Sequence, residues 1–466
     1  MKTFQSQSDQ AIDAETGTIC DLHCHSSYAG GTGSLDLRTA VENMPYKGVT
    51  IVGTGDCLYP PWLKTLKKKL HDPQQNGLLE LKKPKKPVDL ETKFVLQTEL
   101  AFTGPIDVYR KNTHCVFLWP DFEAVDEAIT VLEHYKVKNS MGRPFITSDS
   151  VEETAEKIHA LLDIDPSVEF FPAHILVPLG IYGPKPSITY MRDFFGDAAE
   201  RIHAFETGLS ADPLITALIP ELDELTLLSN SDAHSAAYNR LGRELTCFEL
   251  EELSYDQLIA AIRNDKVAYT AEFHPSEGRY FLTGHRGGIR DHKEHQYCVF
   301  SPDMVPKSMV CPICGSTMEP GVLQRALELS IAQGSEREFG QQYGKKRKFY
   351  HMIPLIEIVA NALGIKSARA KTVRREYLKI VTAIKNECKL WTMESAYLEK
   401  ILEGLVDEEL KTKILEVRKG NFCFDPPGFD GSYGELKIGT KARYQGIRKI
   451  EGIPHPKIQQ TLDEFQ

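Results

Sequence analysis

Residues 48–56 read GVTIVGTGD, a short apolar run that ends on an acidic residue. Similar runs recur along the chain, and each is separated from the next by a stretch of helix-like composition. Apolar runs that alternate with helices are typical of βα units around a parallel sheet or barrel, whose strand ends carry the functional residues. The other runs lie at 93–100, 114–120, 168–176, 202–209 and 225–234. The sequence therefore predicts an α/β fold.

The length and composition narrow the class of protein. The chain has 466 residues, of which 41% are hydrophobic and 26% charged. These values predict more than one folded domain and exclude wholesale disorder. The sequence contains neither an apolar run of about 18 residues nor an apolar segment behind its first lysine, so we expect no membrane span, no secretion signal and a cytoplasmic location.

The charge is unevenly distributed. The net charge is −10, yet residues 341–450 contain 22 Lys and Arg against 13 Asp and Glu. This region therefore has a net charge of +9, which leaves −19 for the rest of the chain. A binding face is local, so the basic C-terminal part is a candidate for contact with nucleic acid despite the acidic total.

Eight histidine and acidic residues lie near the ends of the apolar runs. His23 and His25 in DLHCHS are two residues apart, so on a strand they face the same side. Asp232 and His234 repeat this spacing. The full set is His23, His25, Asp56, Glu99, His114, His174, Asp232 and His234. Such a mixed nitrogen and oxygen set can hold two or three divalent ions. The alternative is a chance arrangement of polar core residues.

Clustered divalent ions suit hydrolysis at phosphorus. One ion lowers the pKa of a water molecule, and the others take up negative charge on the phosphate oxygens. We therefore expect phosphoester cleavage with Zn, Mn or Mg. Catalysis is assigned to Asp232, His234, Glu99 and His174, and Asp232 is the ligand expected to be indispensable.

The order of these residues resembles that of the polymerase-and-histidinol-phosphatase (PHP) family of metal-dependent phosphoesterases. The resemblance covers roughly residues 18–275 and implies a distorted βα barrel that binds up to three ions. Further stretches are similar to endonuclease Q, through nearly the whole chain and in the same order. They are GTGDCLYPPWL (53–63), FETGLSADP (205–213), SNSDAHS (229–235), LGRE (241–244), CPICG (311–315), IPLIEIVA (353–360) and PPGFDGSYG (426–434).

The resemblance to endonuclease Q implies both an architecture and an activity. It implies a PHP domain at 1–280, a zinc-binding module at 281–330, a basic helical DNA-binding domain at 331–450 and a flexible tail at 451–466. It also implies an endonuclease of DNA repair. Such an enzyme nicks DNA on the 5′ side of deaminated bases (uracil, hypoxanthine, xanthine) or abasic sites and leaves a 3′-hydroxyl and a 5′-phosphate.

Two features depart from the family pattern, and one further acid has more than one possible role. Tyr59 stands where the family pattern has a histidine after GTGD, which puts one metal contact in doubt. The loop after His174 reads LVPLGIYG rather than an aromatic-rich form, which can alter the base preference. Glu206 has three possible roles: a metal ligand, a residue that orients a ligand, or a helix cap.

A cysteine pair predicts a second metal site. Cys311 and Cys314 have the spacing that lets two thiolates bind one ion, and Cys298 lies upstream. We take His295 as the fourth ligand, with His285 and His292 as alternatives nearby. A closed tetrahedral zinc site of this kind has a structural or DNA-positioning role. The alternative is a plain turn with free thiols.

Two features point to partners. The stretches KKRKFYH (345–351) and KTVRREYLK (371–379) combine cations with aromatic residues, which suits single- or double-stranded DNA that carries damage. Near the C-terminus, Gln459, Leu462 and Phe465 have the spacing of sliding-clamp-binding peptides. Together they predict a nucleoid-associated protein, with an uncommitted tail as the alternative.

Two other functions are compatible with parts of the sequence. A small-molecule phosphatase could use the same metal site, but it would not need the zinc module or the basic region. An inactive PHP scaffold could act as a DNA-bound adaptor, but the ligand set is intact. Metal content separates these hypotheses, because one zinc ion indicates the adaptor and three or four ions indicate an enzyme.

Overall fold

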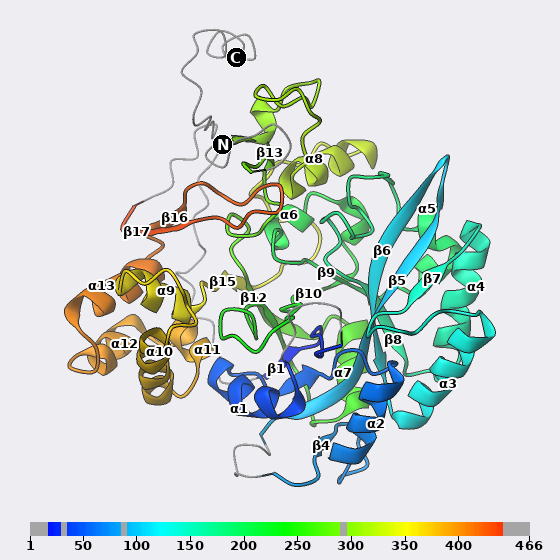
Figure 1. Cartoon of the computed structure of the whole chain (residues 1–466), viewed down its shortest axis with the longest axis horizontal. Helices are drawn as coiled ribbons and strands as arrows, with labels where there is room; N and C mark the ends of the chain where they lie inside the picture. Colours follow the sequence, from blue (N-terminus) through cyan, green and yellow to red (C-terminus); the bar gives the residue numbers. More distant parts are fainter. Residues whose placement is uncertain (1–16, 29–34, 85–90, 289–295, 441–466) are drawn as a thin grey trace.

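The computed structural model of the chain describes residues 17–28, 35–84, 91–288 and 296–440. Its main feature is a large sheet of nine strands (Figure 1). These strands are β1 (Thr18–Asp21), β2 (Ile51–Gly53), β5 (Lys93–Ile106), β6 (Tyr109–Trp119), β7 (Phe145–Thr147), β8 (Glu169–Pro172), β11 (Leu245–Phe248), β12 (Val267–Glu272) and β15 (Phe349–His351). The mixed α/β class predicted from the sequence is confirmed.

The sheet is mixed rather than parallel. Its order is β15-β12-β11-β1-β2-β5-β6-β8, with β7 paired to β5. Four of its eight pairings are parallel and four antiparallel, so the expected parallel arrangement holds for only half of the sheet. The two-residue turn between β5 and β6 allows only an antiparallel pair. Among the described residues, the pairings run from β15 to β8 and do not close into a barrel.

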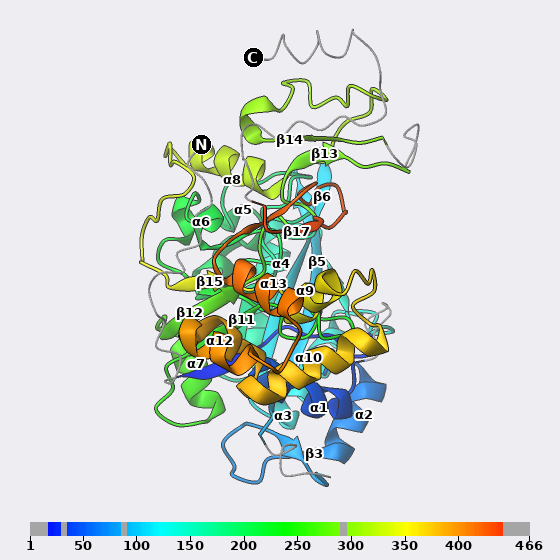
Figure 2. The ribbon, with the colours of Figure 1, turned by 90° about the vertical axis from the view of Figure 1, so that its left-hand side faces the viewer.

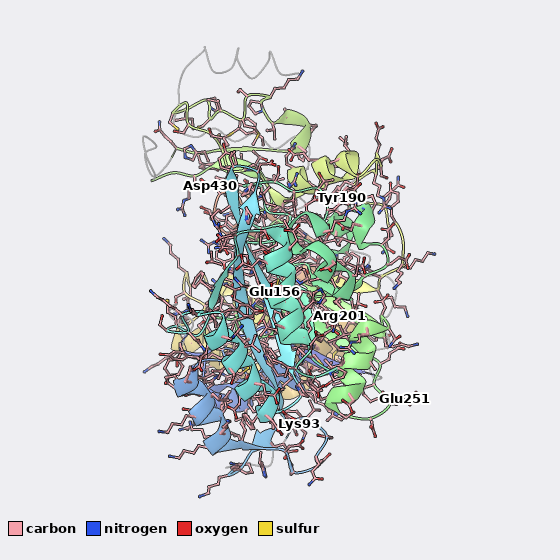
Figure 3. All side chains as sticks on the ribbon, turned by 90° about the vertical axis from the view of Figure 1, so that its right-hand side faces the viewer. Lys93, Glu156, Tyr190, Arg201, Glu251 and Asp430 are labelled. Atoms are coloured by element: carbon pink, nitrogen blue, oxygen red, sulfur yellow. The ribbon has the colours of Figure 1, made fainter. Side chains whose placement is uncertain are left out.

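Side-chain alternation gives the sheet two apolar faces. In β5, Phe94 and Leu96 belong to one core cluster and Val95 belongs to another. Helix α7 (Tyr255–Arg263) packs against the face that contains Val95. The helices that bury residues in the other cluster are α1 (Leu37–Lys47), α2 (Pro60–Lys69), α3 (Phe122–His134), α4 (Val151–Leu162) and α5 (Arg192–Phe195). Figure 3 shows α4, with Glu156 labelled, in front of the sheet.

Capping residues define where several of these helices begin. Asp121 caps α3, Ser150 caps α4 and Ser254 caps α7, and each side chain accepts a hydrogen bond from a backbone N–H of the first turn. These helices therefore start directly after the strands or loops that precede them. The strands that precede them are β6, β7 and β11.

Two short strand pairs lie outside the large sheet. Strands β3 (Leu70–His71) and β4 (Glu80–Leu81) form a hairpin, whereas β9 (Ala204–Glu206) and β10 (Thr226–Leu228) form a parallel pair. A further parallel bridge joins Cys24 to Ala233. This bridge places the segment after β1 beside the segment after β10, although more than 200 residues separate them.

The C-terminal half adds a helical cluster with its own core. Its helices are α9 (Leu355–Ala362), α10 (Lys371–Ile384), α11 (Glu387–Thr392), α12 (Ser395–Leu402) and α13 (Glu408–Arg418). In α10 the buried residues Val373, Tyr377, Ile380, Val381 and Ile384 recur at helical spacing. The cluster lies beside α1 (Figure 1). These helices lie within the range 331–450, which the resemblance implied to be helical, but β15 also lies in this range and belongs to the large sheet.

A third part of the structure surrounds the predicted zinc ligands. Strands β13 (Thr283–His285) and β14 (Cys298–Phe300) form a hairpin at one end of the molecule (Figure 2). Helix α8 (Val322–Ala332) follows and packs on the main core, as does the short α6 (Pro213–Thr216). Strands β16 (Phe422–Phe424) and β17 (Leu436–Ile438) form a hairpin, and the loop between them bridges back to Leu282 through Phe429. No helix among the described residues is long and apolar enough to cross a membrane.

Candidate active site

The eight predicted ligands lie together beside the large sheet. They come from the segment after β1, the ends of β2, β8 and β10, and the middle of the β5–β6 hairpin. Six of them are buried. Asp232 and His234 are more accessible, with 27% and 37% of their side chains exposed. The open side of this metal pocket is therefore the side that carries Asp232 and His234.

His23, His25 and Asp232 form the first group that could hold a metal ion. The Oδ1 atom of Asp232 lies 3.6 Å from His23 Nε2 and 3.2 Å from His25 Nε2. These three atoms are buried, and none makes a well-aligned hydrogen bond to a described residue. Buried polar atoms without partners are costly, and a divalent cation would satisfy all three at once. The donor set fits a metal ion.

Glu99, His114 and His174 form the second group. The Oε1 atom of Glu99 lies 2.7 Å from His114 Nδ1 and 3.3 Å from His174 Nε2. The antiparallel register of β5 and β6 accounts for the first contact, because His114 pairs with Ala101 and so lies diagonally opposite Glu99. His174 follows β8, the next strand across the sheet.

Glu99 joins the two groups into one site. Its Oε1 atom lies 3.7 Å from His23 Nε2, and its Oε2 atom lies 3.6 Å from His25 Nε2. A carboxylate between two sets of imidazoles can bridge two ions, as in the two-metal sites that cleave phosphate esters. The arrangement therefore has donors for more than one divalent ion.

Asp56 and His234 lie at the edge of this arrangement and belong to neither group. Asp56 Oδ1 lies 3.2 Å from His25 Nδ1, and its Oδ2 atom accepts hydrogen bonds from the backbone N–H and the hydroxyl of Ser26. Asp56 thus orients His25. The ring of His234 lies 4.2 Å from that of His25, and His234 Nδ1 lies 3.0 Å from the backbone oxygen of Asp232.

Three of the predicted ligands have unusual backbone conformations. Asp56, His174 and Asp232 have φ values of +50°, +31° and +46°. Positive φ costs free energy in residues other than glycine, and such residues cluster at functional sites. The surrounding structure thus holds all three against local preference and turns their side chains into the pocket.

Glu206 orients two of the ligands. Its carboxylate lies 3.0 Å from His23 Nδ1 and accepts hydrogen bonds from the backbone N–H of His174 and from Asn230 Nδ2. Asn230 Oδ1 in turn accepts from the backbone N–H of Leu22. A carboxylate on the far nitrogen of a metal-binding imidazole fixes the ring and its tautomer. Of the three roles considered for Glu206, the geometry favours orientation.

Arg143 is a site residue that the sequence analysis did not identify. Its Nη1 atom lies 3.0 Å from Glu99 Oε2, and a quarter of its side chain is exposed. It follows Gly142, where a Cβ atom would lie within 3 Å of the Asp56 carboxylate. The segment thus brings a cation to the rim of the pocket, where it could contact a phosphate.

The electrostatics of the pocket are dominated by its carboxylates. Burial lowers the pKa of His23, but Glu206 and Asp232 outweigh burial and raise it to about 9. Burial raises the pKa of Asp232, whereas His23 and His234 hold it well below its ordinary value. The negative charge that favours a proton on His23 also favours a divalent cation in the same place.

An aromatic group lies beside the pocket. The ring of Tyr28, three residues after His25, lies 5.2 Å from that of Tyr59 and 6.0 Å from that of Trp62. Tyr28 is 39% exposed. Tyr59 therefore packs in this aromatic group. Exposed aromatic rings at such a place can stack on unpaired bases.

The second predicted metal site lies in the β13–β14 hairpin. His285, Cys311 and Cys314 form a group that could hold a metal ion, with 3.3 Å between His285 Nδ1 and Cys314 Sγ. Cys298 Sγ lies 3.6 Å from Cys311 Sγ, and Cys298 is paired with His285 across the hairpin. The four donors suit a closed tetrahedral site, with His285 in the place assigned to His295. His295 and His292 lie outside the described residues.

The predicted nucleic-acid stretches differ in their exposure. In the first stretch, Arg347 donates to the backbone oxygens of Leu222 and Leu225, and Lys345 donates to that of Glu224. These two cations therefore hold the fold together. The cations of α10 face solvent. Gln459, Leu462 and Phe465 lie outside the part of the chain that the structure describes.

Comparisons with known proteins extend over most of the chain. No protein-family model matches it. It is similar to the lesion-specific endonuclease Q of Pyrococcus furiosus, with a TM-score of 0.71 and 27% identity over 90% of this chain and 95% of that one. It is also similar to an endonuclease Q in complex with a 27-mer duplex that has an abasic lesion at the active site, with a TM-score of 0.73 and 26% identity over 92% and 99%. The chain has the fold of endonuclease Q.

The resemblance to endonuclease Q inferred from the sequence is thereby confirmed. Two curated relatives are themselves uncharacterized. A Methanocaldococcus jannaschii protein is 30% identical over 249 residues, which are 50% of this chain and 28% of that protein. A Bacillus subtilis protein is 25% identical over 287 residues, which are 56% of this chain and 67% of that protein. The chain thus spans little more than a quarter of the M. jannaschii protein.

Proposed function

We propose that the chain is a metal-dependent endonuclease of DNA repair. It nicks the phosphodiester bond 5′ to a deaminated base (uracil, hypoxanthine, xanthine) or an abasic site and leaves a 3′-hydroxyl and a 5′-phosphate. The observation that carries this proposal is the metal pocket, with its two groups joined by Glu99, in a chain that matches endonuclease Q over nine tenths of its length. One of the matched endonuclease Q structures holds a duplex with an abasic lesion at its active site.

The residues of the pocket have separate roles in the proposed reaction. His23, His25, Asp232, Glu99, His114 and His174 would hold the ions, and His234 lies at the open side. When bound, divalent ions would lower the pKa of a water molecule and neutralise charge on the phosphate. Glu206 and Asp56 hold the imidazoles in place, and Arg143 offers a cation to the phosphate. Tyr28 offers a ring to a base that has left the stack.

The C-terminal parts support binding rather than chemistry in this proposal. Zinc held by His285, Cys298, Cys311 and Cys314 would fix the β13–β14 hairpin against the rest of the chain. The exposed cations of α10 would bind DNA phosphates. Recruitment by a sliding clamp through Gln459, Leu462 and Phe465 stays a prediction from the sequence.

Cleavage of end-labelled duplexes tests the proposal. Each duplex carries uracil, hypoxanthine, xanthine, an abasic site or no lesion, and each is incubated with Mn, Mg or chelator. We expect a metal-dependent nick immediately 5′ to a lesion and none in the undamaged duplex. A protein that hydrolyses a small phosphomonoester but leaves every duplex intact would contradict the proposal and support the phosphatase.

A further inference from the structure

Outside the metal pocket, three arginines surround one tyrosine. The guanidinium carbon of Arg240 lies 4.7 Å from the centre of the Tyr433 ring, and that of Arg279 lies 5.6 Å from it. Arg243 Nη1 lies 3.4 Å from the Tyr433 hydroxyl. Burial raises the pKa of Tyr433, but Arg243 and Arg240 outweigh burial and lower it. Positive charge is therefore concentrated around this ring.

A fourth arginine approaches the same loop. A Cβ atom at Gly431 would lie 3.4 Å from Arg286 Nη1 and 3.5 Å from Arg279 Nη2, so both side chains reach the backbone there. Arg279 Nε also donates to the Gly431 oxygen at 2.8 Å. Gly431 has a φ of +83°, which glycine adopts without strain. We call Arg240, Arg243, Arg279 and Arg286 the four-arginine site.

Three members of the four-arginine site have no carboxylate partner. Among the described residues, Arg240, Arg243 and Arg279 form no ion pair, and their hydrogen bonds go to backbone oxygens and the Tyr433 hydroxyl. Half-buried arginines elsewhere are of both kinds: Arg337 and Arg263 are ion-paired with Asp223 and Glu169, whereas Arg347 donates to backbone oxygens. The four-arginine site differs because several such cations lie together around one ring. A buried guanidinium without a counter-charge is costly, which points to an anion that arrives from outside the chain.

The acids near the four-arginine site do not neutralise it. Burial raises the pKa of Glu277 well above its ordinary value, and the neighbouring Glu357 raises it further, which favours the protonated form of Glu277. Glu357 also accepts a hydrogen bond from Asn239. Asp430 accepts one from the backbone N–H of Arg286. None of these acids is ion-paired with Arg240, Arg243 or Arg279 among the described residues.

The four-arginine site is connected to the metal pocket through one loop. Arg243 Nε donates to the backbone oxygen of Ser231 at 3.0 Å, directly before Asp232. Arg240 lies eight residues after Asp232 in the same loop. Arg243 is buried, whereas Arg240 is half-buried and Arg279 is exposed, so an anion can reach the site from solvent.

We propose that the four-arginine site binds a backbone phosphate of the DNA strand that is cut, a short distance along the strand from the scissile phosphodiester. Guanidinium groups match phosphate oxygens in geometry as well as in charge. Tyr433 holds three of them in fixed directions, which lowers the entropic cost of binding. This inference rests on the proposed function, because it names the contact that would hold the substrate across the metal pocket.

Salt dependence of DNA binding tests the role of these charges. The variants are Arg240→Gln and the exposed Arg279→Gln, and the matched control is Arg201→Gln. Arg201 is half-buried, ion-paired with Asp163 at 3.3 Å, and labelled in Figure 3 away from Asp430 of the loop. Binding of a lesion duplex in chelator should weaken about tenfold in each test variant. The plot of log affinity against log salt should become shallower by about 0.9 for each phosphate that the variant no longer binds. A slope equal to that of Arg201→Gln would overturn the proposal.

Single neutral phosphates locate the bound phosphate on the strand. A series of duplexes carries one methylphosphonate at successive positions of the cut strand. At one position, the methylphosphonate should weaken binding by the parent protein. The same methylphosphonate should not weaken binding by Arg240→Gln or Arg279→Gln any further, because these variants already lack a guanidinium that would hold the phosphate there. Penalties that add at every position would contradict a shared binding site.

The two proposals fail in different ways. In one case the parent protein nicks no lesion duplex, but the arginine variants still lower the salt slope and one methylphosphonate position still has no further effect on them. The proposed function then fails and the phosphate site stands. If the parent nicks lesion duplexes and both arginine variants bind DNA as the parent does, the site fails and the proposed function stands.

Discussion

The two metal-capable sites found among the described residues are built in opposite ways. The metal pocket gathers histidines and carboxylates from strands that are up to about 200 residues apart in sequence, on a sheet with apolar cores on both faces. The β13–β14 site brings three cysteines and one histidine together from within 30 residues, and the buried members of its own apolar cluster are Cys298, Phe300, Cys311 and Met318. We therefore expect the fold to hold the first site in place, and a metal ion at the second site to hold that part of the fold together.

This difference indicates that the metal pocket is suited to catalysis and the cysteine site to a structural role. A sulfur-rich set of four donors closes around one ion and leaves no position for a substrate. The pocket has hard donors for more than one ion and an open side at Asp232 and His234. Removal of a ligand should therefore abolish activity in the pocket without unfolding it, and should unfold the hairpin region at the other site.

The largest effect is expected from Asp232→Asn. This change removes a charged oxygen that faces both His23 and His25, so nicking should fall by a factor of about 10³ or more, while DNA binding and the unfolding temperature are retained. Single-turnover cleavage and a binding titration measure this. The matched control is Asp256→Asn, a change of an exposed acid at the start of α7, which should nick like the parent. Nicking by Asp232→Asn at the parental rate would contradict the ligand assignment.

Cys311→Ser should act on structure. One zinc ion should be lost, and the β13–β14 hairpin should become sensitive to protease, because apparent free energies of zinc binding in small domains are about 10 kcal/mol or more. The large sheet should keep its unfolding temperature. Metal analysis and limited proteolysis measure the effect, and Cys423→Ser, which lies outside the site, is the control. A Cys311→Ser protein with parental zinc content and protease resistance would show that the thiols are free.

Glu206→Gln tests orientation within the pocket. The amide keeps the shape but loses the charge that faces His23 Nδ1, so metal affinity or activity should fall by a factor of about 10 to 100. Titration of the chelated protein with Mn measures this fall. Glu251→Gln, at an exposed acid labelled in Figure 3, should have no effect. A complete loss comparable with that of Asp232→Asn would indicate that Glu206 is itself a ligand.

The residues of the metal pocket could be predicted from the sequence because each follows or lies in an apolar strand-like run. His285 was one of the alternatives considered for the fourth zinc ligand, and its place opposite Cys298 depends on the hairpin register, which the sequence alone does not give. The contacts of Arg143 and of the four-arginine site could not be predicted. They depend on loops that meet only in the folded chain, as when residues 426–434 return to Arg240 and Arg279. The antiparallel pairings of the sheet could not be predicted for the same reason, because the direction of a strand depends on pairing with distant parts of the chain.

The last prediction concerns the pH dependence of the free energy of unfolding, through the buried Glu272. Burial raises the pKa of Glu272 from 4.5 to about 7, although Ser229 and Thr270 donate to its carboxylate. Between these pH values the folded protein binds more protons than the unfolded chain, so stability is present below pH 4.5 and is lost as the pH rises to about 7. The loss is about 3 kcal/mol. Urea unfolding at several pH values should show a flatter dependence for Glu272→Gln, and an unchanged slope would contradict this assignment.

The central claim is that the metal pocket, and not the cysteine site, carries out the reaction. Metal counting during stepwise chelation, together with cleavage of an abasic duplex in the same samples, tests it directly. We predict that nicking disappears as the weakly held ions leave, while one zinc ion remains bound, and that added Mn restores it. Nicking that persists until the zinc ion is removed, and returns only with zinc at the cysteine site, would contradict the account.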